Sequence, residues 1–124
     1  MSSKLSNTQL SQLIKAKALE LGLQACGIAA AEPVDLTTKQ FFSDWLSQGY
    51  HADMDYLANH FEKRMNPMLL VPNTKSIISV ALNYYPSRFI PKSEYQLSWY
   101  AYGKDYHLLM RQKMEELFEY INQI

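Results

Sequence analysis

Histidine and carboxylate side chains are the groups in this sequence best suited to binding a metal. His51 and Asp55 are four positions apart, so a helix would place them on one face, whereas His60 and His107 lie far along the chain. A zinc site needs three or four ligands, and neither an HExxH nor a CxxC pattern occurs in the 124 residues. We therefore expect these side chains to cap helices or face solvent, with no metal ligand among them.

Cysteine and glycine usage excludes several other site types. Cys26 is the single cysteine, so it forms no internal disulfide and supplies one of the four thiolates that an iron–sulfur cluster normally requires. Its apolar neighbours predict a buried structural thiol. The four glycines are too scattered for a phosphate-binding loop.

Charge and hydropathy point to a globular domain. Twelve basic residues balance twelve acidic ones, so any contact with RNA must be local. The first residues lack the apolar run of a signal peptide, and no stretch approaches the ~20 apolar residues of a membrane span. With 48% hydrophobic residues in 124, the sequence predicts one domain, cytoplasmic and without a membrane partner.

The first half of the chain predicts two helices and one strand. Apolar spacing indicates a helix from Asn7 to Leu21, capped by Asn7 or Thr8 and ended by Gly22. The apolar run 23–31 is typical of a strand. Thr37 or Thr38 would open a second helix that closes at Gly49, and residues 51–59 would form a short helix. Met54 and Tyr56 are expected in the core.

The second half predicts a strand, a long excursion and a final helix. Residues 67–72 form a connection, and the β-branched run Ser76–Tyr84 suits a central strand. Residues 86–102 form an excursion of a length that is more often functional than idle. Asp105 would cap a helix whose apolar stripe is Tyr106, Met110, Met114, Leu117 and Ile121. This helix has no stop signal before Ile124, so we expect a longer natural polypeptide.

An aromatic cluster falls in and after the excursion. Its members are Tyr95, Trp99, Tyr100, Tyr102 and Tyr106. Such a cluster either lines a site for a flat ligand or covers a core. Interleaved polar residues in a segment that reads as loop favour the binding interpretation.

Four motifs follow one another in an order that resembles the start of the epoxyqueuosine reductase family. They are GYHADMDYL at 49–57, EKRMNP at 62–67, LLVPNTKSIISVALNYYP at 69–86 and YAYGKDYH at 100–107. The KR-x-x-P and YGKDYH runs are the most specific. The resemblance extends from about Leu10 to the last residue.

The resemblance implies an enzyme that reduces epoxyqueuosine to queuosine in tRNA. It implies a base-off cobalamin and two [4Fe–4S] clusters in a ferredoxin-like domain. The fold would be α/β, an α+β sandwich related to flavin nitroreductases, and residues 1–124 would supply the amino-terminal part of its cobalamin-binding domain. The ferredoxin-like domain would be absent from this chain.

Site residues are carried over by position. Arg64 matches a cobalamin-contacting arginine, whose charged fork suits a corrin amide or phosphate oxygen. Ser98 matches a second position beside the cofactor. Asp105 and His107 match part of the pocket for the modified nucleoside, where they would bind cyclopentane hydroxyls.

The family's proton donor and cluster cysteines are expected beyond Ile124, so the chain alone would bind without reacting. An uncovered last helix and sheet edge would make it self-associate. Two alternatives stay open: a standalone interaction or RNA-binding module derived from this region, and a corrinoid reductase of a small molecule.

Overall fold

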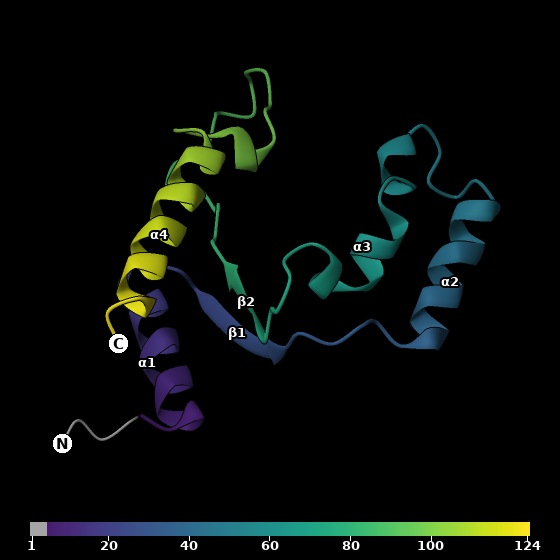
Figure 1. Cartoon of the computed structure of the whole chain (residues 1–124). Coiled ribbons are helices and arrows are strands. Elements are labelled where there is room, and N and C mark those ends of the chain that lie inside the picture. The colour runs from purple at the N-terminus through teal and green to yellow at the C-terminus, as the bar shows by residue number, and fades with distance from the viewer. Residues whose placement is uncertain (1–4) are drawn as a thin grey trace. The chain divides into compact units, whose positions relative to one another are not determined.

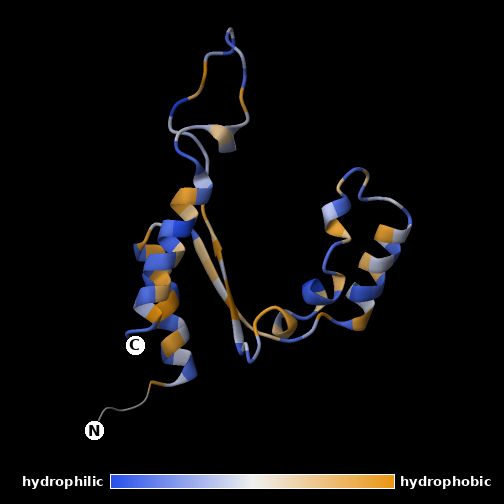
Figure 2. Cartoon of the chain, turned by 45° about the horizontal axis from the view of Figure 1, so that its top comes forward, coloured by the Kyte–Doolittle hydropathy of each residue, from blue (hydrophilic) through white to orange (hydrophobic). Residues whose placement is uncertain are grey.

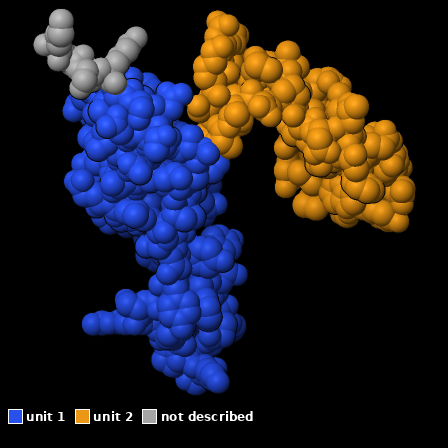
Figure 3. All heavy atoms as spheres, turned by 90° about the horizontal axis from the view of Figure 1, so that it is seen from below, with its two compact units in different colours: residues 1–28, 78–124 blue, residues 29–77 orange. Residues whose placement is uncertain are grey.

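The computed structural model describes residues 5–124 as two compact units (Figure 3). Unit 1 comprises Met1–Ile28 and Ile78–Ile124, and unit 2 comprises Ala29–Ile77. Unit 1 holds the helices α1 (Asn7–Glu20) and α4 (Tyr106–Ile121) and the short 3-10 helix η3 (Trp99–Ala101). The two strands, β1 (Ala25–Ala30) and β2 (Ser76–Ala81), run from one unit into the other (Figure 1). Helices and a small sheet together confirm the predicted α+β class.

Helix α1 begins at a capping box. The Ser6 hydroxyl accepts a hydrogen bond from the Gln9 amide at 3.2 Å, and the Gln9 side chain accepts one from the Ser6 amide at 2.9 Å. The predicted caps Asn7 and Thr8 are therefore wrong, because the reciprocal Ser6–Gln9 pair satisfies the free amides one residue earlier. Gly22, with φ of +82°, ends the helix as predicted.

The core of unit 1 lies where α1 meets α4. Ile14, Ala18, Leu23 and Leu117 are buried there, and Met110 and Ile121 pack at the margin. Asp105 caps α4, as predicted, by accepting a hydrogen bond from the His107 amide. Two members of the predicted stripe, Tyr106 and Met114, remain about half exposed, so the buried face of α4 is narrower than the sequence pattern suggests.

A side chain of α4 also closes the carboxyl end of α1. The Lys113 ammonium donates a hydrogen bond to the Leu21 carbonyl. A cation at this position stabilises the negative end of the helix dipole and satisfies a carbonyl that has no partner within the helix. The two helices are therefore joined by a polar contact as well as by the core (Figure 1).

Strands β1 and β2 form a two-stranded sheet. The Gln24 amide donates to the Ala81 carbonyl at 2.9 Å and the Ala31 amide to the Lys75 carbonyl at 3.0 Å, so the strands run antiparallel. The prediction of a central strand over 76–84 is wrong in one respect. β2 is mostly hydrophobic (Figure 2), yet within residues 5–124 it pairs on one side only, and nearly all its side chains are exposed.

Unit 2 contains α2 (Leu36–Ser47), α3 (Phe61–Met65) and two 3-10 helices, η1 (Asp55–Leu57) and η2 (Pro67–Leu69). Asp35, and not a threonine, caps α2: its carboxylate accepts hydrogen bonds from the Thr38 amide and hydroxyl, which lower its pKa. The predicted helix over 51–59 is mostly turns.

Aromatic packing joins the helices of unit 2. The Phe42 ring stacks on Trp45 and on Phe61 with centroids 6.0 and 5.8 Å apart. Met54 and Tyr56 are 43% and 59% exposed, which contradicts their expected place in the core. Among the residues described, no helix has the length and apolar character to cross a membrane.

Candidate ligand site before and within α4

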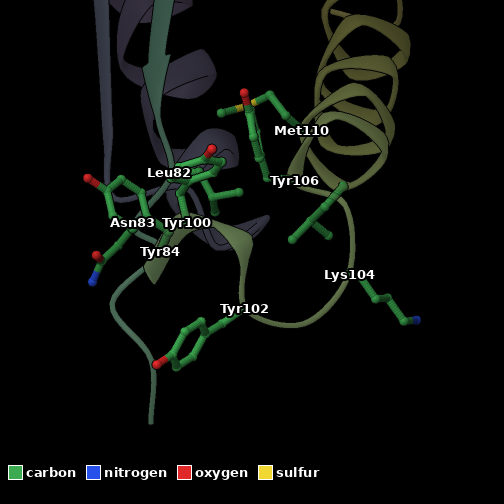
Figure 4. A pocket seen from close by; sticks show the side chains of 9 residues that line it. Leu82, Asn83, Tyr84, Tyr100, Tyr102, Lys104, Tyr106 and Met110 are labelled. Carbon is green, nitrogen blue, oxygen red and sulfur yellow. The ribbon is translucent and has the colours of Figure 1, made fainter. Parts of the chain in front are cut away.

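A pocket of about 650 Å³ opens in unit 1 beside the start of α4 (Figure 4). Its walls come from the chain after β2, from the end of the excursion and from the first turns of α4. The lining residues are Leu82, Asn83, Tyr84, Tyr100, Tyr102, Lys104, Tyr106, Leu109 and Met110. This volume falls within the range of small-molecule sites in proteins, which are mostly apolar with a few polar groups.

Tyrosine rings form much of the pocket wall. Tyr100 and Tyr106 meet edge to face, with ring centroids 6.2 Å apart and ring planes at 85°. Tyr100, Tyr102 and Tyr106 belong to the cluster noted in the sequence, and the structure places all three around one cavity. Tyr95 does not join them, since it is 96% exposed at the tip of the excursion.

Asp105 and His107 form a paired unit at the first turn of α4. Asp105 Oδ1 accepts a hydrogen bond from the His107 amide at 2.9 Å and lies 2.8 Å from His107 Nδ1. The backbone hydrogen bond, followed by the contact with the imidazole, holds the pKa of the Asp105 carboxyl below its usual value. The His107 ring stacks on Tyr106 with centroids 4.0 Å apart, which fixes its orientation.

The pair borders a second hollow next to the pocket. This hollow has a volume of about 420 Å³ and shares Tyr100, Lys104 and Tyr106 with the pocket. Among the described residues, neither Asp105 Oδ2 nor His107 Nε2 has a hydrogen-bond partner. The pair therefore presents one carboxylate oxygen and one ring nitrogen to a ligand.

Ser98 and Arg64 have structural contacts of their own. The Ser98 carbonyl accepts a hydrogen bond from the Ala101 amide at 2.9 Å, and its exposed hydroxyl makes no capping bond. Arg64 lies in unit 2, where Nε donates to the Asn59 carbonyl at 3.0 Å and Nη2 to the Tyr56 carbonyl at 3.1 Å. The structure thus brings Asp105 and His107 together in unit 1, whereas Arg64 is described only within unit 2.

Several pocket residues were missed in the sequence, namely Leu82, Asn83, Leu109 and Met110. A polar Asn83 directly after an apolar strand is a usable signal, because ligand sites often form where strands end. Leu109 and Met110 carry no such signal, since apolar residues on a helix predict packing. The histidine of unit 2, His51, has a buried Nδ1 without a partner, and its Nε2 lies 3.9 Å from Asp55. No group of three or more potential metal ligands gathers within residues 5–124.

Comparison with known proteins gives the site a family context. Residues 64–124 match the family model described as "Epoxyqueuosine reductase QueG, DUF1730". The epoxyqueuosine reductase of Leadbetterella byssophila is 46% identical over 111 residues, covering 90% of this chain and 36% of the relative. That of Escherichia coli is 39% identical over 130 residues, covering 99% and 34%. The chain is a relative of epoxyqueuosine reductase. The resemblance noted in the motifs is confirmed.

Solved structures of epoxyqueuosine reductase share the fold. One, crystallised with an epoxyqueuosine-modified tRNA-Tyr stem loop, superposes with a TM-score of 0.75 at 29% identity and covers 94% of this chain. Another, from Bacillus subtilis with its catalytic loop swung out of the active site, gives a TM-score of 0.74 at 29% identity. Each match covers 32% of the solved chain, so this chain spans about a third of the length of the proteins it matches.

Proposed function

We propose that this chain is the amino-terminal part of an epoxyqueuosine reductase, a cytoplasmic enzyme that converts epoxyqueuosine to queuosine in tRNA. The observation that carries the proposal is the similarity to epoxyqueuosine reductases along nearly the whole chain, 46% identical in one relative. The aromatic pocket at α4 supports it, since a modified nucleoside is a flat ring system with polar substituents.

The pocket residues would bind and orient the nucleoside. Tyr100 and Tyr106 present ring faces and edges on which a base can stack. Asp105 Oδ2 would accept a hydrogen bond from a hydroxyl of the cyclopentane ring, and His107 Nε2 would bind a second hydroxyl. Because the Asp105–His107 contact fixes the imidazole, this binding would require little reorganisation.

Cobalamin is the cofactor that the family resemblance implies, and the chain's polar groups fit it. The exposed Arg64 guanidinium uses Nε and Nη2 on carbonyls of its own unit, and among the described residues Nη1 has no partner. It would donate a hydrogen bond to an amide or phosphate oxygen of the cofactor. Ser98 would contact the cofactor through its exposed hydroxyl. When bound, cobalamin supplies the redox chemistry of the reaction.

The two [4Fe–4S] clusters would be held elsewhere in the enzyme. Cys26, the one cysteine in the sequence, is half-buried within β1 and supplies too few thiolates for either cluster. We infer that residues 1–124 contribute binding surfaces, and that a ferredoxin-like domain and the proton donor come from further polypeptide. The isolated chain would then bind its ligands weakly and not turn over.

The decisive experiment is genetic. In a strain whose gene for this protein is deleted, tRNA should accumulate epoxyqueuosine, and the intact gene should restore queuosine, as nucleoside analysis by mass spectrometry would show. If tRNA stays fully modified in the deletion strain, reduction of a small molecule by a corrinoid enzyme becomes the better account.

The coding sequence after residue 124 separates the remaining alternative. A reading frame that continues into two cysteine-rich cluster motifs agrees with the reductase. A frame without them would favour a standalone interaction or RNA-binding module.

A further inference from the structure

The excursion between β2 and α4 carries an exposed aromatic triad, which comprises Tyr85, Phe89 and Trp99. The three rings meet edge to face, with centroid distances of 5.2 Å for Tyr85–Trp99 and 5.5 Å for the other two pairs. Each ring nevertheless keeps about half its surface in solvent, at 63%, 52% and 46% exposure. The triad is thus a mutually braced set of aromatic surfaces outside the core and outside the pocket lining.

The tip of the excursion is ordered by its own hydrogen bonds. The Gln96 side-chain amide donates to the Pro91 and Glu94 carbonyls, each at 2.9 Å, and the Glu94 amide donates to the Pro91 carbonyl at 2.9 Å. These contacts close a turn that holds Tyr95 outward, almost fully exposed. A rigid support lowers the entropic cost when an exposed ring binds a partner.

Positive charge accompanies the rings. Arg88 and Lys92 lie between members of the triad, against the single acidic residue Glu94, in a chain whose overall charge is zero. Both basic side chains are exposed, and among residues 5–124 neither has an ion-pair or hydrogen-bond partner. Elsewhere Lys17, Lys39 and Arg111 are paired with carboxylates.

We propose that residues 85–99 form a contact surface for a single-stranded RNA loop. Exposed aromatic rings stack nucleobases without regard to sequence, and unpaired Arg and Lys side chains bind the phosphates between them. A paired stem offers no unstacked base to the triad, so the surface favours the loop of a hairpin over its stem. The inference rests on the proposed function, in that it assigns the RNA partner of that enzyme to particular residues outside the pocket.

Trp99 itself reports on the contact. The chain has two tryptophans, so a Trp45→Phe chain leaves Trp99 as the sole indole. Titration with an unmodified RNA hairpin at low salt should quench the Trp99 fluorescence, because a stacked base lies against the ring. An RNA duplex made of the same stem should quench it much less. Equal quenching by the duplex, or none by the hairpin, would overturn the proposal.

Substitutions then separate stacking from charge. In the natural sequence background, anisotropy of a labelled hairpin should show that Trp99→Ala weakens binding about 5- to 150-fold. Arg88→Ala combined with Lys92→Ala should lower the slope of log affinity against log salt by about 1.4, which is ~0.7 for each phosphate released. Circular dichroism establishes that each variant is folded, and Trp99→Phe, which keeps an aromatic ring in the triad, should retain most of the affinity.

The matched control is Lys15→Ala combined with Lys75→Ala, which removes the same charge from two exposed lysines outside the excursion. This pair should leave the salt slope unchanged. An equal loss in both double variants would mean that total charge, and not this surface, governs binding, and the proposal would fail. Because the assay uses unmodified RNA and measures no turnover, failure of reductase activity in the genetic test would leave its result standing.

Discussion

Arg64 is the residue whose carried-over role is easiest to isolate. Its two hydrogen bonds to Tyr56 and Asn59 carbonyls hold the turn before α3. In the full-length protein we expect Arg64→Ala to weaken cobalamin binding in an absorbance titration. Arg64→Lys should fail to restore it, since one ammonium cannot reproduce a planar fork that bridges two carbonyls and a ligand.

Lys63→Ala is the control for Arg64, because it removes an exposed charge next door without touching either carbonyl. Its cobalamin affinity should match that of the parent. Unchanged affinity in Arg64→Ala would refute the assignment of this arginine to the cofactor.

Asp105 gives the chain an acid-sensitive helix cap. Hydrogen bonds from His107 depress its folded-state pKa, so the ionised carboxylate favours the folded form. This contribution is complete above the unfolded pKa of about 4 and is lost as pH falls through the lower folded value. Asp105→Asn still caps the helix but does not titrate.

We expect the urea midpoint of Asp105→Asn to depend less steeply on pH than that of the parent below about pH 4. Glu94→Gln serves as the control, because among the described residues its side chain makes no hydrogen bond, and it should follow the parent curve. Identical acid slopes for Asp105→Asn and the parent would show that the cap contributes nothing through its charge.

At the scale of elements, the contact from Lys113 to the end of α1 joins two helices that meet in a small core. Lys113→Met keeps the length of the side chain and removes the donor. We expect the free energy of unfolding to fall by about 1 kcal/mol, from the lost charged hydrogen bond and helix-end interaction. Lys15→Met, at an exposed position on α1, should change it by less than about 0.5 kcal/mol in denaturant titrations.

Adjacent residues on α4 should differ sharply in their cost of truncation. Leu117 is 4% exposed in the core, whereas Phe118 is 64% exposed. We expect Leu117→Ala to destabilise the chain by about 2–5 kcal/mol, the usual cost of emptying a core leucine site. Phe118→Ala should cost less than about 0.5 kcal/mol. Similar losses in chemical denaturation would contradict the burial pattern of this helix.

The sequence predicted most elements but misplaced their first residues. Helices α1 and α2 follow from apolar spacing, yet their caps are Ser6 and Asp35, because several neighbouring side chains could serve and only three-dimensional geometry selects one. The strand β2 was correct in extent and wrong in setting. Its apolar run is typical of a buried central strand, whereas here it has one partner.

The site shows a similar division. Tyr100, Tyr102 and Tyr106 stood out because aromatic residues in a loop are unusual, and they do line the pocket. The pairing of Asp105 with His107 was beyond the sequence, since it depends on the side-chain rotamers at the first turn of α4. Leu109 and Met110 could not be told from core residues by periodicity alone.

At the scale of the whole molecule, large apolar side chains remain exposed on both main elements of unit 1. Met114 and Phe118 on α4 are 46% and 64% exposed, and Ile78 on β2 is 37% exposed. Such surfaces promote association, so we expect dimers or larger oligomers of the 124-residue chain in sedimentation velocity. Met114→Lys with Phe118→Lys should shift the population toward monomer. A parent chain that stays monomeric across concentrations would refute this.

Unit 2 is a nested insertion, since its residues interrupt those of unit 1. Its two ends are held together by the hydrogen bond from the Ala31 amide to the Lys75 carbonyl, so residues 32–74 leave and re-enter the sheet at neighbouring points. A tight reverse turn that joins Ala31 to Lys75 would convert β1 and β2 into a simple hairpin. The helical insert can therefore be deleted or exchanged as a module, which allows its contribution to ligand recognition to be measured apart from the rest.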